Sequence, residues 1–282
     1  MAMVYDLIDD DELRQDIRDI VIDLTDGLID NYWWIVDVDG HPTTKGPNIL
    51  PPMRLTWSLI AYHITGEERF GDIVRKWLRD EHRQELTTAS ITFFNHYADY
   101  YGNNLAHTNW YNLLRLGKVY FSPEDYAFFL DLFDTEVHTF TRLSHNPWFN
   151  GFFTSTDLYT PTKDDPFQDQ LIEDLDTFQD PPMRFYFLPA RTGWDPDPVS
   201  VILYNLMQQY PWLEVLAGGS WKIIADEPFP VDQQCSAGFM FQWNPYDVDD
   251  CGTDDPSNTH SGHDFLAAYW LGTYLGFVTK DM

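Results

Sequence analysis

The chain has 282 residues, and its 45 acidic side chains against 17 basic ones give a formal net charge of -28. This balance excludes nucleic acid as a partner and disfavours membrane surfaces, because binding to phosphate groups requires clustered Lys and Arg. No apolar run approaches the roughly 20 residues that cross a bilayer. No Pro/Gly/Ser-rich linker divides the chain, so we expect a single domain over residues 1–282.

Acidity of this degree is typical of a chain that works in high salt or of a secreted protein that meets divalent cations, since both settings screen self-repulsion. We expect a disulfide between Cys235 and Cys251, which would stabilise the fold by roughly 3 kcal/mol. A disulfide favours an oxidising compartment, yet Met1–Asp6 lacks the features of a signal peptide. We therefore expect a secreted or periplasmic protein without its leader, with a cytoplasmic protein of a halophile as the alternative.

Helical periodicity recurs along most of the chain, whereas sustained strand alternation is almost absent. Gly66 is a typical helix stop, and Ser122, which precedes a proline and two acids, is a typical helix start. Short turns between neighbouring helices predict helical hairpins. In chain order, we expect helices at Leu13–Leu28, Met53–Ile64, from Glu67, Leu86–Tyr101, Asn103–Leu116, from Ser122, Val199–Tyr210 and His263–Val278.

The last of these helices is almost uncharged, so all of its faces should be buried. Gly272 and Gly276 lie four residues apart on it and would let a neighbouring backbone approach. Two segments, roughly 143–198 and 211–262, show little periodicity and are far longer than ordinary connections. We expect both to form irregular loops on one face of the helical frame, where they roof an aromatic cleft. The alternative is that both segments only wrap around one end of the helical frame and pack against it, without forming a binding site.

Three stretches of the chain resemble a known group of proteins: Trp34–Thr44, Gly102–His107 continuing to Leu113–Leu116, and Asp264–Gly272. They resemble an uncharacterised group of bacterial helical-toroid proteins, whose implied fold is similar to the (α/α) barrels of glycosidases and polysaccharide lyases. The resemblance implies an all-α fold, an (α/α) toroid built of helical hairpins. It implies no activity, so the chemistry must come from the residues themselves.

The first candidate site contains two carboxylates beside two indoles. Asp37 and Asp39 stand two residues apart on an extended segment that follows Trp33 and Trp34, so both carboxylates point the same way. Cleavage of a glycosidic bond needs an acid and a base or nucleophile. The pair could supply one of these groups, with the indoles as stacking platforms. The alternative is a turn in which the acids accept hydrogen bonds from nearby backbone N–H groups.

The second candidate site combines Asn, His and Tyr near a helix end, which resembles the residue set of helical-toroid polysaccharide lyases. In such a site Asn neutralises a uronate carboxylate, and His or Tyr removes the adjacent proton. The net charge opposes a polyuronate, so neutral or cationic sugars fit better. The alternative is a set of satisfied polar residues between packed hairpins. The candidates are His96 and His107 for proton transfer, and Asn95, Tyr100, Asn104, Trp110 and Arg115 for substrate binding.

The third candidate site is the acidic loop that leads into the last helix. Oxygen ligands of this kind suit Ca²⁺, although the loop lacks the regular EF-hand spacing. His263 is a candidate substrate contact, and Asp264 is a candidate catalytic carboxylate that also has the position of a helix cap. The candidate calcium ligands are Asp247, Asp249, Asp250 and Asp254.

Together these patterns predict a carbohydrate-active enzyme that cleaves glycosidic bonds of an oligo- or polysaccharide by carboxylate acid–base chemistry, with Asp37 or Asp39 and Asp264 as the carboxylates. A polysaccharide lyase is one alternative, and it would rely on Asn95, His96, Tyr100 and Arg115. A non-catalytic glycan-binding or scaffold protein is the other. The sequence predicts no oligomeric state.

Overall fold

The computed structural model describes residues 2–43, 48–90, 100–139, 141–142, 144–160, 166–177, 193–213, 222–234, 243–248 and 263–278. These residues form helices and no β-strand, which confirms the all-α prediction. The chain falls into two compact units, residues 1–90 with 108–132 and residues 91–107 with 133–282. The toroidal arrangement and the single domain stay predictions. None of the described helices is long and apolar enough to cross a membrane.

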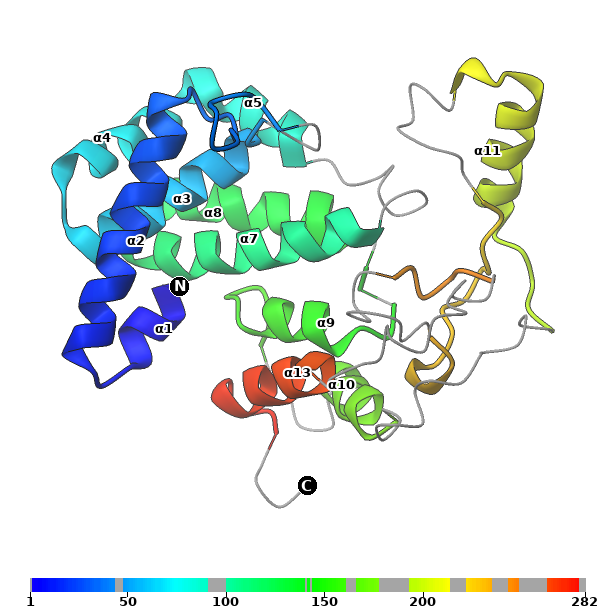
Figure 1. Ribbon diagram of the computed structural model, residues 1–282. Helices are drawn as coiled ribbons and strands as arrows, with labels where there is room; N and C mark the ends of the chain where they lie inside the picture. Colours follow the sequence, from blue (N-terminus) through cyan, green and yellow to red (C-terminus); the bar gives the residue numbers. More distant parts are fainter. Residues whose placement is uncertain are drawn as a thin grey trace. The chain divides into compact units, whose positions relative to one another are not determined.

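The first unit is organised around α3 (Pro51–Thr65), which contacts the four helices nearest to it in sequence (Figure 1). α3 begins with two prolines, whose missing N–H groups are not needed in a first turn, and ends at Gly66, whose φ of 70° is left-handed. Leu55, Leu59 and Ala61 are fully buried, so α3 forms the centre of this unit. The four helices are α1 (Ala2–Leu7), α2 (Asp11–Asp30), α4 (Glu68–Trp77) and α5 (Asp80–Ser90).

Two further helices contribute to the first unit. α7 (Tyr100–Tyr120) crosses the boundary between the units, and α8 (Pro123–Leu132) follows it. Ser122 accepts a hydrogen bond from the Asp125 backbone N–H at 3.1 Å, which confirms the predicted helix start. The helices expected at Met53–Ile64, from Glu67 and at Asn103–Leu116 are confirmed as α3, α4 and part of α7.

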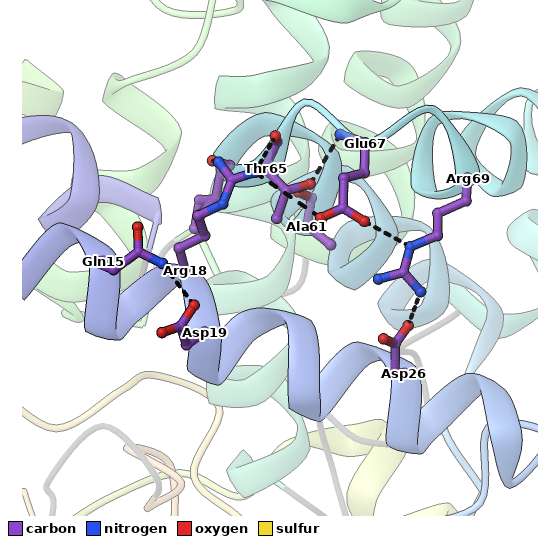
Figure 2. A network of polar contacts seen from close by, with 9 residues as sticks. Gln15, Arg18, Asp19, Asp26, Ala61, Thr65, Glu67 and Arg69 are labelled. Carbon is purple, nitrogen blue, oxygen red and sulfur yellow. Dashed lines mark hydrogen bonds and ion pairs between the residues drawn. The ribbon is translucent and has the colours of Figure 1, made fainter.

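Two arginines fasten α2 to the corner between α3 and α4 (Figure 2). Arg18 donates from its two Nη atoms to the carbonyl oxygens of Ile64 and Thr65, at 3.2 and 2.8 Å. Those carbonyls end α3, where C=O groups lack helical partners and the helix dipole is negative. Arg69 bonds both Glu67, at 2.8 Å, and Asp26 of α2. The corner is therefore held by cations at a place where the backbone itself attracts them.

In the second unit, α9 (Pro147–Thr154), α10 (Pro166–Asp176) and α13 (His263–Tyr274) pack against one another. Asn146 caps α9 by accepting the N–H groups of Trp148 and Phe149, and Pro147 occupies the first turn. The unit also contains a π-helix, η1 (Phe133–His138), then α11 (Pro198–Gln209) and a 3₁₀ turn, η3 (Val231–Gln233). Its buried core consists of Phe149, Leu171, Leu175, Val231, Ala268 and Val278.

Two expectations about this unit are corrected. The segment 143–198 is not an irregular loop throughout, because α9 and α10 lie within it. α9 has only eight residues and carries aromatic residues on several faces, so no periodicity marks it. The last helix is not buried all round either. On α13, Leu266, Trp270 and Tyr274 are 43%, 58% and 52% exposed.

Gly272 in α13 and Gly276 just after its end serve a reversal of the chain and not the approach of a neighbouring backbone. A Cβ on Gly272 would lie 2.8 Å from Cγ2 of Val278, so only glycine leaves room for that side chain. The N–H groups of Phe277 and Val278 both donate to the Gly272 carbonyl oxygen. Gly276 supplies the left-handed φ of 82° that turns the chain back.

The contact between Arg18 and α3 yields a test of the first unit. Arg18→Met keeps the apolar stem but removes two charged hydrogen bonds, so the free energy of unfolding should fall by about 1–3 kcal/mol. Arg75 is the control, because its ion pairs with Glu68 and Asp72 stay within α4 and face solvent. Arg75→Met should change stability much less. Equilibrium urea unfolding measures both, and an equal loss in the two variants would contradict the role given to Arg18.

Candidate functional site

A histidine paired with a buried aspartate lies between two helices of the second unit. Nδ1 of His145 is 2.7 Å from Oδ1 of Asp174, which is on α10 and only 2% exposed. Gln170, one turn earlier on α10, donates its amide to the same Oδ1 at 3.0 Å. Because the carboxylate accepts, Nδ1 carries the proton and Nε2 is left with a lone pair. This is the arrangement that orients an imidazole for proton transfer.

The backbone holds His145 in place from both sides. Its φ of 49° is left-handed, a conformation that costs a non-glycine residue roughly 1–2 kcal/mol. Asn146 follows as the cap of α9, and Gln234 donates its side-chain amide to the carbonyl oxygens of His145 and Phe229, at 3.3 and 2.7 Å. Strain of this kind persists only where the surroundings enforce it, and it gathers at functional sites.

Electrostatics make His145 a base of useful strength. The hydrogen bond to Asp174 raises the pKa of His145 above its usual value, although partial burial acts in the opposite direction. The imidazole is 29% exposed, so a small molecule can reach it. Oδ2 of Asp174 is buried and has no hydrogen-bond partner among the described residues. Oδ1 of Asp174 therefore accepts both hydrogen bonds, one from the ring that it orients and one from Gln170.

The same unit contains two fully buried imidazoles. His107, on α7, stacks on Phe149 with centroids 4.1 Å apart, and His138 stacks on Phe153 at 4.5 Å. His107 Nδ1 must donate to the Asn103 carbonyl oxygen at 2.8 Å, because that oxygen can only accept. His107 Nε2 is then an acceptor, 3.3 Å from Nδ1 of His138. The two rings thus form a chain of hydrogen bonds that starts at a backbone carbonyl.

Burial keeps both imidazoles neutral. It lowers the pKa of His107 to about 4, against a small opposing effect of the bond to Asn103. Burial, together with His107 and Arg142, holds the pKa of His138 well below its usual value. Within the part of the chain that the structure describes, Nε2 of His138 is buried without a partner. His138 ends the π-helix η1, a rare element that often occurs near functional sites. The predicted proton-transfer residue His107 is therefore an inaccessible neutral ring, and His145 is the accessible one.

The predicted carboxylate pair lies in a turn of the first unit. Oδ1 of Asp37 accepts the backbone N–H groups of Asp39 and His41, both at 2.9 Å, which is the hydrogen bonding of the turn alternative. One side-chain donor atom from each of Asp37, Asp39 and His41 lies within 4.8 Å of the others, and all three residues are exposed. The set is close enough to hold a cation. Nearby, Trp34 is 41% exposed and Trp33 has a left-handed φ of 65°.

Two further predicted residues of the first unit make structural contacts. Trp110 is 2% exposed and packs its ring on Phe129. Arg115 donates to Asp6 of α1 at 2.7 Å, and the other oxygen of Asp6 is 2.7 Å from Nε2 of His63. Burial raises the pKa of Asp6, but the bonds from His63 and Arg115 outweigh it and leave that pKa below its usual value. These contacts account for Arg115 without a substrate.

The remaining predicted residues belong to the second unit or lie outside the described residues. Asp264 is fully buried and accepts the Phe265 N–H at 2.9 Å, whereas His263 is exposed. Tyr100 begins α7, Asn104 is half-buried on it, and Asp247 pairs with Lys222 at 3.3 Å. The cleft that would gather Asp39 and Asp264 stays a prediction. His96, Asn95, Asp249, Asp250, Asp254, Cys235 and Cys251 lie outside the described residues.

The sequence analysis missed His145 and Asp174. One signal was available, because Asn146 followed by Pro147 is a typical helix start and marks His145 as the residue just before a cap. Nothing in the sequence distinguishes Asp174 from the many acids of the surface. Its burial depends on Leu171 and Leu175, which place α10 in the core.

Comparisons with known proteins found no significant relative of this chain. No family model matches the chain. No significant match was found among curated proteins or among solved structures. The fold and the site are therefore interpreted from the chain's own residues.

The buried imidazoles predict a loss of stability in mild acid. In the unfolded chain both rings bind protons below pH about 6.5, whereas in the fold they stay neutral. The free energy of unfolding should therefore fall as the pH drops from about 6.5, by up to about 1.4 kcal/mol per pH unit for each ring. His138→Phe keeps a stacked ring and should reduce this slope. Urea unfolding between pH 7 and pH 5 measures it.

The control for this experiment is His41→Gln, because the His41 side chain is 77% exposed and lies outside the buried pair. Equal slopes in wild type and His138→Phe would contradict the neutral state of the buried pair.

Proposed function

We propose that this protein is a hydrolase of glycosidic bonds in which His145, oriented by Asp174, acts as the general base. The observation that carries the proposal is the 2.7 Å contact between Nδ1 of a partly exposed imidazole and a carboxylate that is 2% exposed. A buried carboxylate fixes the tautomer, so that Nε2 faces the substrate as an acceptor. The base takes a proton from water as the water oxygen attacks the anomeric carbon, the bond from that carbon to the glycosidic oxygen breaks, and the departing oxygen takes its proton from solvent.

A histidine base suits the described residues better than the predicted carboxylate pair. Asp37 is occupied by two backbone N–H groups, and Asp264 is fully buried. An acid or base that transfers a proton must come within hydrogen-bond reach of the substrate. His145 meets this requirement because part of its ring is exposed.

Aromatic residues and charge support a neutral or cationic saccharide as the substrate. Trp148, Phe265 and Tyr269 are partly buried and pack on the core that carries Asp174. Aromatic faces of this kind stack on sugar rings. The net charge of -28 repels polyuronates, so elimination from an acidic polysaccharide is the less favoured chemistry.

The direct test is a panel of neutral and amino saccharides assayed for released reducing ends. His145→Gln and Asp174→Asn should each lower kcat/KM by about 100-fold or more, because a positioned base contributes at least that factor. His82→Gln is the matched control, since His82 pairs with Glu85 at 3.1 Å in the first unit. The melting temperature of each variant shows whether it folds.

Three outcomes would contradict the proposal. Full activity of His145→Gln would remove His145 from the reaction. An unsaturated product that absorbs in the ultraviolet would show elimination and not hydrolysis. Silence of the wild-type protein across the panel would favour a non-catalytic role.

The raised pKa of His145 predicts the pH profile. A general base is active only when deprotonated, so kcat/KM should rise with pH through a value above the usual 6.5 or so. In Asp174→Asn the carboxylate that raises the pKa of His145 through its hydrogen bond and charge is gone. The residual activity of that variant should therefore reach its plateau at lower pH than wild type. If the rise of kcat/KM with pH occurs at the same pH in Asp174→Asn as in wild type, the titrating group is not His145.

A further inference from the structure

One face of α2 carries an apolar row that the first unit does not cover. Leu13, Ile20 and Leu24 are 40%, 50% and 46% exposed, whereas Ile17 and Val21 are 8% and 0% exposed. Four apolar positions, 13, 17, 20 and 24, follow one another in alternating steps of four and three residues. This spacing forms a straight stripe on a helix and is the seam of helix-to-helix packing. One edge of the apolar stripe, with Ile17 and Val21, is therefore buried in the first unit. The other edge, with Leu13, Ile20 and Leu24, is exposed to solvent.

An acidic row runs beside this stripe. Asp16, Asp23 and Asp30 follow one another at intervals of seven residues, and all three are exposed. None of them makes an ion pair with the described residues. Asp26 lies elsewhere on the helix and faces Arg69 at the corner of α3 and α4 (Figure 2). The open edge of the stripe thus has carboxylates that the unit itself does not neutralise.

The positions of the acids fix the chemistry of a partner. Leu13 and Ile20 occupy one of the two core positions of a heptad repeat, and Ile17 and Leu24 occupy the other. The three aspartates then all fall at one position that flanks this core, where charge determines which partner binds. A helix laid along this stripe would bring its own flanking residues within reach of those carboxylates. Lys or Arg there would form ion pairs, and Asp or Glu would repel.

We propose that this face of α2 is a docking surface for a basic amphipathic helix of another protein. The partner inserts apolar residues between Leu13, Ile20 and Leu24, and its flanking Lys or Arg residues pair with the acidic row. Burial of the three side chains supplies the attraction, and the charges select the partner and speed its approach.

A second copy of this chain does not fit the same surface. In an antiparallel pair of α2 helices, the acidic rows of the two copies would oppose each other. In a parallel pair, each acidic row would face the flank that contains Arg14 and Val21. Val21 is already buried in its own unit, and Arg14 already bonds Asp11 and the Tyr5 carbonyl oxygen. Neither arrangement supplies a cation that is not already bonded within the unit. The partner must therefore bring the positive charge that this chain lacks.

The test uses the full chain and a synthetic helical peptide of about four turns, with Leu at the seam positions and Lys at the flanking positions. Fluorescence anisotropy measures its binding to wild type and to the double variant Ile20→Gln with Leu24→Gln, which keeps good helix formers. Binding should weaken about tenfold or more in the double variant, because two apolar anchors are lost. Ile202→Gln with Leu206→Gln is the matched control, since those residues of α11 are 59% and 40% exposed.

Charge is tested separately. Asp16→Asn, Asp23→Asn and Asp30→Asn together should weaken binding and reduce its dependence on salt, because the ion pairs are gone. A peptide of the same composition with a scrambled order has no apolar face and should bind much more weakly. Hydrogen exchange of the wild-type protein should show α2 amides protected on addition of the Leu–Lys peptide.

Several results would overturn the proposal. If the scrambled peptide bound as tightly as the Leu–Lys peptide, binding would depend only on general attraction to the acidic surface of the protein. Unchanged binding by the α2 double variant, or protection that appears on α11 and not on α2, would place the peptide elsewhere. Self-association of the protein that depends on Ile20 and Leu24 would assign the face to a second copy.

Discussion

The scarcity of positive charge constrains every helix contact in this chain. With 45 acidic residues against 17 basic ones, most carboxylates have no basic side chain of their own to pair with. Several of the arginines are placed where helices meet. Arg18 and Arg69 join α2 to the corner of α3 and α4, Arg115 joins α7 to α1, and Arg83 joins α5 to Asp125 of α8. Each of these contacts bonds a carboxylate or a helix carbonyl, so one side chain satisfies acceptors and offsets repulsion together.

The same constraint shapes the interior of the second unit. No arginine reaches the buried carboxylate of Asp174 among the described residues, and an imidazole takes that place. An imidazole in this role has a titratable proton, which an arginine lacks, so the pairing that stabilises Asp174 also produces a base. His107 and His138 show the opposite case, because no described acid pairs with them and burial lowers the pKa of both. On α2 the acids of the outer row pair with no cation among the described residues, and this is the row that we propose a partner binds.

The sequence predicted the frame better than the site. Helical periodicity located α3 and α4, which pack on each other, and α7 and α8, where Trp110 packs on Phe129. It missed α9, whose eight residues give the periodicity too few turns, and α10, which lies in a segment rich in Pro and Asp. It also misjudged α13, since an uncharged sequence does not reveal that Trp270 faces solvent. The site residues were predicted less well than the helices. The sequence does not show that Asp174, which the leucines of α10 place in the core, is buried while the acids near it are exposed. His107 was predicted to transfer protons, but the ring is fully buried and stacked on Phe149, which is distant in sequence.

The dependence of stability on salt tests the central claim most directly. If self-repulsion among carboxylates is the dominant electrostatic effect, screening should raise the free energy of unfolding steadily from about 10 mM to 1 M KCl, with most of the gain at low salt where the Debye length shrinks fastest. The hydrogen bonds of Arg18 to backbone carbonyls are partly buried and should survive that screening. A urea midpoint that falls as KCl is added would show that exposed ion pairs outweigh the repulsion, and would contradict the account.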